Sequence, residues 1–176
     1  MTILSLDLAT TTGYAILRAD GSIVHGEQSF AGHPREGEGA RFLKFQMWLV
    51  REIAQPYPDL ERIVYEKVIG VGPSQAFAAQ IHGGFRALML MFADIRRIPC
   101  DGFNVTTVKK QFVGSGKATK DDVMAQCRSL GFKVQNHNEA DALAILHVAT
   151  NTCPILTMSG ATPKKKRKPE LAERPF

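Results

Sequence analysis

The sequence has few cysteines and no long hydrophobic run. Its three cysteines, Cys100, Cys127 and Cys153, show neither CxxC nor Cys/His spacing, so neither a disulfide framework nor a zinc module is predicted and a reducing cytosol is favoured. The longest apolar stretches, at 87–93 and 140–149, are interrupted or too short to span a bilayer, and no basic segment precedes an apolar run near residue 1. We therefore expect a cytoplasmic protein with no membrane segment.

Composition indicates a folded domain with an uneven charge. Hydrophobic residues make up 44% and charged residues 22% of the 176 residues, as in soluble globular domains, and the length fits one domain. The net charge is +5, and residues 164–176 hold six basic against two acidic residues. We predict one domain over residues 1–153 and a basic, disordered tail over 154–176, which would add salt-sensitive affinity for DNA.

The hydrophobic pattern predicts an α/β fold with a mixed five-stranded sheet flanked by helices. Strands are expected at residues 2–8, 13–18, 22–29, 61–68 and 100–105. Helices are expected within 35–54, from 73 to about 94, at 106–112, from 119 to 131 and from 138 to 150. The first three strands follow one another through short turns and are expected to be antiparallel, whereas the crossover helices make the last two parallel to their neighbours.

Three acids in separate elements are the main candidates for chemistry. Asp7 and Glu66 end predicted strands and Asp141 lies in the last helix, each among apolar residues. A single acid at a strand end is more often a capping or turn residue than a ligand. Acids that end two adjacent central strands, however, would lie side by side. Buried carboxylates without basic partners favour a hard divalent cation such as Mg²⁺.

Four segments resemble, in order and spacing, the RuvC family of Holliday-junction resolvases in the RNase H-like superfamily. They cover residues 4–15, 63–66, 108–110 with 114–120, and 138–144. The resemblance implies an RNase H-like fold and an endonuclease that cuts four-way DNA junctions by paired, symmetric nicks in recombination and repair. A small chain with a basic tail fits a bacteriophage-type member that acts in a bacterial cell or an infected host.

The resemblance also implies a metal site. Asp7 would bridge two Mg²⁺ ions, for which Mn²⁺ would substitute, and Glu66 and Asp141 would complete the ligand set. Many family members have a fourth acid three positions before the last aspartate, where this chain has Asn138.

The identity of the fourth ligand stays open in the sequence. Asn138 and His137 precede Asp141 by three and four residues and therefore share its helix face, whereas Glu139 points elsewhere. Asn138 is the first choice and His137 the second, and either is a weaker ligand than aspartate. Glu139 remains an alternative that acts through a water.

Basic and polar residues downstream of the fifth strand are candidate DNA contacts. Lys117 and Lys120 would place positive charge beside the scissile phosphate, although solvated surface residues are the alternative. Sequence-independent contacts to the DNA backbone are expected from Lys109, Lys110, Ser115, Arg96 and Arg97. Ile69 stands where some relatives have an aromatic wedge, and it is either an apolar wedge at the junction centre or an ordinary strand or core residue.

The resemblance implies a homodimer, because a two-fold protein matches a junction that is cut symmetrically. The predicted helix from residue 73 offers an apolar stripe for an interface or for the core: Phe77, Ile81, Phe85, Leu88 and Phe92. The rival interpretations are a broader fork and flap nuclease, an RNA-directed nuclease, a non-cleaving DNA-binding module and an actin-like nucleotide-binding protein. The last would need a duplicated domain, so we expect no nucleotide cofactor.

Overall fold

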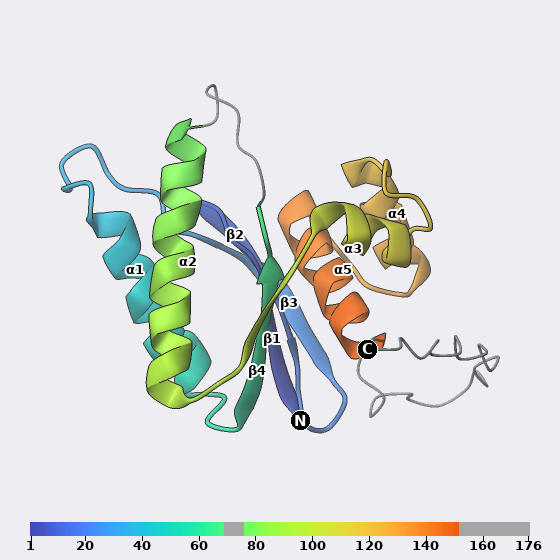
Figure 1. Ribbon diagram of the computed structural model, residues 1–176, viewed down its shortest axis with the longest axis horizontal. Helices are drawn as coiled ribbons and strands as arrows, with labels where there is room; N and C mark the ends of the chain where they lie inside the picture. The colour runs from blue at the N-terminus through green and yellow to red at the C-terminus, as the bar shows by residue number, and fades with distance from the viewer. Residues whose placement is uncertain (69–75, 152–176) are drawn as a thin grey trace, which may run out of the picture.

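The computed structural model describes residues 1–68 and 76–151 and shows one sheet between two layers of helices (Figure 1). The sheet has the order β3-β2-β1-β4-β5. Its strands are β1 (Thr2–Asp7), β2 (Thr11–Leu17), β3 (Ile23–Ser29), β4 (Leu60–Glu66) and β5 (Cys100–Phe103). The first three are antiparallel neighbours, and β4 and β5 run parallel to β1. The predicted mixed five-stranded α/β fold is confirmed.

Helices cover both faces of the sheet (Figure 1). One face carries α1 (Ala40–Trp48), the π-helix η1 (Leu49–Ala54) and α2 (Ala76–Arg96), and the other carries α3 (Val105–Phe112), α4 (Lys120–Ser129) and α5 (His137–Asn151). The predicted helix within 35–54 is therefore two segments, since the Gln55 N–H bonds to the Val50 carbonyl five residues earlier. None of the described helices is long and apolar enough to cross a membrane.

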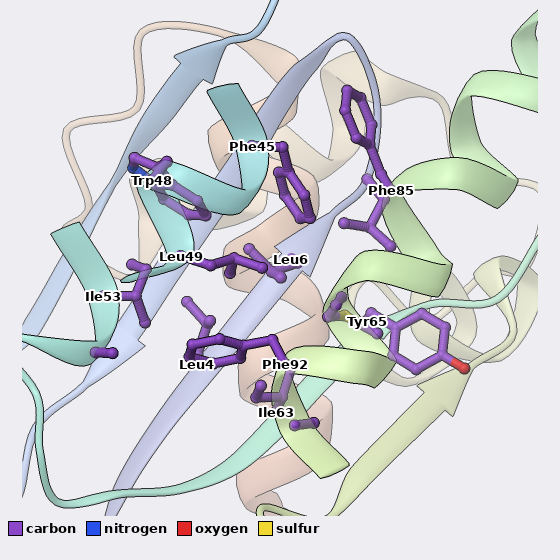
Figure 2. Packing of buried hydrophobic residues seen from close by; sticks show 14 of the residues in the cluster. Leu4, Leu6, Phe45, Trp48, Leu49, Ile53, Ile63, Tyr65, Phe85 and Phe92 are labelled. Atoms are coloured by element: carbon purple, nitrogen blue, oxygen red, sulfur yellow. The ribbon is translucent and has the colours of Figure 1, made fainter. Parts of the chain in front are cut away.

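The face under α1 and α2 is packed with aromatic and large aliphatic side chains (Figure 2). Phe85 of α2 lies 4.8 Å from Phe45 of α1 between ring centroids, and Phe30 meets Phe45 edge to face at 5.2 Å. Leu4 and Leu6 project from β1 into the same cluster. Such rings bury large apolar areas and interlock in one arrangement, so this face supplies a rigid support for the sheet.

The predicted apolar stripe on α2 belongs largely to this core. Ile81, Phe85 and Phe92 are buried, and Leu88 packs partly against them. Phe77 is 67% exposed. The stripe as a whole is therefore not a free surface, because the sheet already covers most of it.

The other face combines an aliphatic core with small residues at points of β1 and β2 where α5 lies close to the strands. The Ser5 hydroxyl donates a hydrogen bond to the Ala142 carbonyl at 2.7 Å. A Cβ atom at Gly13 would overlap the backbone carbonyl of Asn138. Only glycine at position 13 permits this approach, so the backbone of α5 is held directly against β1 and β2.

Two helix starts downstream follow their sequence signals. The Asn104 side chain accepts from the Thr106 N–H at the start of α3. Thr119 and Asp122 form the reciprocal capping box that their spacing predicts at the start of α4. Ile69 and the tail over 154–176 lie outside the described residues, so the wedge and the domain boundary stay predictions.

Candidate active site

Two of the three predicted acids end neighbouring strands. Asp7 is the last residue of β1 and Glu66 the last residue of β4. The strands are parallel and Leu6 pairs with Tyr65, so Asp7 and Glu66 lie side by side at one edge of the sheet. Side chains alternate between faces, and Val64 belongs to the core under α5. Both carboxylates therefore face α5.

The helix α5 brings the third acid to this edge. Asp141 precedes Ala142, whose carbonyl accepts from the Ser5 hydroxyl. Burial raises the pKa of Asp7 to about 7, with the charges of Glu66 and Asp141 contributing. Burial and the charge of Asp141 raise the pKa of Glu66, and burial raises the pKa of Asp141. The three carboxylates thus act on one another across separate elements.

The positive charges of two lysines partly offset this negative charge. The charge of Lys120, the first residue of α4, partly offsets the rise in the pKa of all three carboxyls. Lys109 lowers the pKa of Glu66 and Asp141, and its ammonium donates to the Ala118 carbonyl at 2.7 Å. Sequence reasoning treated Lys109 only as a DNA-backbone contact, because nothing local to α3 shows that its side chain reaches this edge.

The connector before α4 is folded back on α3. The Ser115 hydroxyl accepts from the Lys117 N–H at 3.3 Å, and Gly114 has a left-handed φ of 94°. Lys110 and Lys117 are exposed. Lys120 is exposed as well, so what distinguishes Lys109 and Lys120 from these two lysines is the effect of their charge on the carboxylates and not their burial.

Arg96 and Arg97 lie far from the three acids. They end or follow α2, which begins at the edge of the sheet where β4 ends and runs toward the opposite edge (Figure 1). A helix of 21 residues is about 30 Å long. The structure therefore does not bring these two arginines together with the lysines near the carboxylates, and their contact with the DNA backbone stays a prediction.

The candidates for a fourth ligand have different surroundings. The Asn138 amide donates to Glu27 at 2.9 Å. His137 lies 3.8 Å from Asp121, and its charge lowers the pKa of Asp141. Both remain predictions as ligands.

Glu139 is engaged in starting α5. Its carboxylate accepts from the Gln135 N–H at 3.1 Å and from the Asn136 amide at 3.2 Å. The Asn136 side chain in turn accepts from the Glu139 N–H at 3.0 Å. Its oxygens also face His25, with a closest separation of 3.4 Å. The Glu139 carboxylate thus caps the helix, and its water-bridged role at a metal stays a prediction.

The donor set at this edge fits a hard divalent cation. Within residues 1–68 and 76–151, no group of three His, Cys, Asp or Glu side chains lies close enough together to hold a metal ion as the side chains stand. Asp7, Glu66 and Asp141 nevertheless offer carboxylate oxygens, and no ion pair to a basic residue engages them in the described part of the chain. Bound Mg²⁺ or Mn²⁺ would offset the unfavourable burial and repulsion that raise their pKa values.

Comparisons with known proteins support the architecture. No protein-family model and no curated protein matches the sequence. The fold is similar to Thermus thermophilus RuvC in complex with a Holliday junction substrate, with a TM-score of 0.68 and 22% identity over 82% of this chain and 90% of that chain. A second Thermus thermophilus RuvC structure gives 0.65 and 21% over the same shares.

A more distant similarity is to the yeast mitochondrial Holliday junction resolvase. Its TM-score is 0.54 at 10% identity, over 81% of this chain and 75% of that one. At these identities the likeness establishes the fold, and it confirms the predicted RNase H-like architecture.

Proposed function

We propose that the protein is a metal-dependent endonuclease that cuts four-way DNA junctions by paired, symmetric nicks. The observation that carries the proposal is the convergence of Asp7, Glu66 and Asp141 at one partly buried edge. Support comes from the fold, which is similar to structures described as Holliday junction resolvases, one of them holding a junction substrate. The work of such an enzyme is DNA recombination and repair in the cytoplasm of a bacterial cell or an infected host.

The three carboxylates would hold the metal. Two divalent ions, Mg²⁺ or Mn²⁺, would supply the charge that activates the attacking water and stabilises the leaving 3′ oxygen. Asp7, which is affected by the charges of both Glu66 and Asp141, would be the shared ligand, and Glu66 and Asp141 would complete the set. The phosphodiester would be left with 5′-phosphate and 3′-hydroxyl ends.

Lysine charge would place the scissile phosphate against these acids. Lys120 and Lys109 act on the carboxylates in the free protein, so a phosphate at this edge would meet both ammonium groups. In a partly desolvated site their attraction is stronger than in water. Lys110, Lys117 and Ser115 would contact the DNA backbone outside the reacting phosphate, where they position the strand without reading sequence.

A homodimer would present two such edges to one junction. The described part of α2 keeps three large apolar side chains exposed at helical spacing, Phe77, Met91 and Ile95. Ile95 is 75% exposed. These residues, and not the buried remainder of the predicted stripe, are the candidates for contact with a second copy of the chain.

The experiment that tests this function compares DNA structures. End-labelled four-way junctions, forks, flaps, plain duplex and an RNA–DNA hybrid are incubated with the protein and Mg²⁺, and the products are mapped at nucleotide resolution. We expect paired, symmetric nicks in the four-way junction alone. Equal cutting of forks and flaps would replace the proposal with a general debranching nuclease, and cutting of the hybrid alone would indicate RNA-directed work. Tight binding without cutting would indicate a DNA-binding module.

A further inference from the structure

A fourth acid stands in the same row of the sheet as the candidate site. Asp7 of β1 pairs with Gly13 of β2, and Gly13 pairs with Glu27 of β3. Neighbouring strands are about 4.8 Å apart, which puts the backbones of Asp7 and Glu27 about 10 Å from each other. Ile23 of β3 is partly buried and packs against the core under α5, and side chains alternate, so Glu27 faces α5 as Asp7 does.

Asn138 occupies the gap between these two acids. Its backbone carbonyl lies where a Cβ of residue 13 would be, and its side-chain nitrogen donates to the Glu27 carboxylate at 2.9 Å. Asp141 follows Asn138 by three residues, so the two share one face of α5. Glu27 and the metal-ligand candidates are therefore linked through a single side chain.

The chemistry of this hydrogen bond fixes the amide orientation. An ionised carboxylate only accepts, so Asn138 must turn its NH₂ arm toward Glu27. The carbonyl arm of the planar amide then points away from Glu27. Within the described residues that oxygen accepts no hydrogen bond from another side chain or from the backbone. It is thus available as a neutral oxygen ligand of the kind that Mg²⁺ and Mn²⁺ accept.

We propose that Glu27 is a positioning residue of the candidate metal site, which holds Asn138 so that its amide oxygen, and not its nitrogen, is presented to the divalent cation. This inference rests on the proposed function and goes beyond it, because it gives a residue of the outer strand a role in metal affinity. Glu27 itself need not touch the ion.

An aspartate at position 138 would make Glu27 dispensable. A carboxylate carries an oxygen on both arms, so it presents a ligand whichever way it turns. Glu27→Ala should therefore weaken metal binding when residue 138 is asparagine and have little effect when it is aspartate. A simple through-space charge effect of Glu27 would weaken binding in both backgrounds alike.

The test measures Mn²⁺ affinity by titration calorimetry on metal-free full-length proteins: wild type, Glu27→Ala, Asn138→Asp and the double variant. Removing a partner that orients a metal ligand typically weakens affinity about tenfold or more. We expect about a tenfold loss for Glu27→Ala, at least wild-type affinity for Asn138→Asp, and a double variant within about twofold of Asn138→Asp. The recovery in the double variant also excludes misfolding as the cause of the loss.

Glu61→Ala is the matched control, since it removes an exposed strand glutamate near the opposite edge of the sheet. We expect it to bind Mn²⁺ like the wild type. Wild-type affinity in Glu27→Ala, or equal losses in both backgrounds, would overturn the positioning role while the nuclease proposal stands. No Mn²⁺ binding and no junction cutting by the wild type would overturn the nuclease proposal itself.

Discussion

The two faces of the sheet are packed by different kinds of side chain. Under α1 and α2 the core is built from interlocked rings such as Phe30, Phe45 and Phe85. Under α5 the core also holds large aliphatic side chains such as Leu146, but Ser5 and Gly13 lie directly beneath the helix: Ser5 donates to the α5 backbone, and Gly13 leaves room for it. On the first face the rings interlock across the elements. The second admits a helix backbone close to the strands, which is what brings an acid of α5 to the acids that end β1 and β4.

The largest expected effect belongs to the aromatic face. Phe85→Ala removes a fully buried ring that contacts three other aromatic residues. We expect a loss of about 3–5 kcal/mol in the free energy of unfolding, measured by urea titration. Because this face lies behind the sheet, the cutting rate per folded molecule should stay near the wild-type value at low temperature. A large loss of cutting with little loss of stability would contradict the assignment of stability to this face and of the candidate active site to the other.

The acids on the other face should show the opposite pattern. We expect Glu66→Gln and Asp141→Asn each to lower single-turnover junction cutting by at least about a hundredfold, since each removes a ligand charge. Junction binding in Ca²⁺ or without metal should stay within about threefold, because phosphate contacts carry most of the affinity. Near-normal cutting by either variant would remove that residue from the site.

Gly13→Ala should disturb the close approach of α5. A methyl group at this position overlaps the Asn138 carbonyl, so α5 must shift, at a cost of about 1–3 kcal/mol. Metal affinity should fall together with stability, because Asn138 and Asp141 move with the helix. As a comparison, Gly83→Ala adds a methyl group within α2 where nothing lies within 4 Å, and we expect unchanged cutting and a gain in stability of about 0.5–1 kcal/mol, since alanine is favoured over glycine in a helix. Wild-type metal affinity in Gly13→Ala would show that the spacing of α5 is not critical.

The pKa of Asp7, raised to about 7 by burial and by its acidic neighbours, predicts a pH dependence of stability. Because Asp7 binds its proton more tightly in the folded state than in the unfolded state, protonation stabilises the fold. This contribution is complete below the unfolded pKa of 3.8 and is lost as the pH rises through about 7. The metal-free wild type should therefore be less stable at pH 8 than at pH 5.5. Asp7→Asn should reduce this difference and be more stable at pH 8, by on the order of 2 kcal/mol. Thermal unfolding in chelator checks this, and equal pH profiles would contradict it.

The smallest expected effects separate the two classes of lysine. Lys120→Ala should lower cutting about tenfold, because Lys120 acts on all three carboxyls. Lys117→Ala should lower cutting less and mainly weaken DNA binding, with a shallower salt dependence. Equal rate losses at saturating DNA would place both lysines at the reacting phosphate.

The sequence predicted the five strands, their antiparallel or parallel directions and the acids that end β1 and β4, because these follow from local signals. Alternating or apolar runs mark strands, and a chain that crosses over a sheet returns parallel. The capping box of Thr119 and Asp122 was predictable for the same reason, since its partners are three residues apart.

What the sequence could not predict depends on residues far apart in the chain. The Glu27–Asn138 hydrogen bond joins positions 111 residues apart, and the requirement for Gly13 exists only once α5 has docked. The reach of Lys109 to the carboxylates and the burial of most of the α2 stripe likewise follow from tertiary packing.

The most direct test of the account is the single-turnover cutting of a four-way junction by Asp7→Asn at a protein concentration that saturates the DNA. Asp7 is the most buried of the three acids and the one whose charge is most opposed by its neighbours, so the account assigns it the central metal-binding role. We predict cutting at least about a hundredfold slower than wild type in Mg²⁺, with junction binding retained. Cutting at the wild-type rate by this variant would contradict the assignment of the active site to this edge of the sheet.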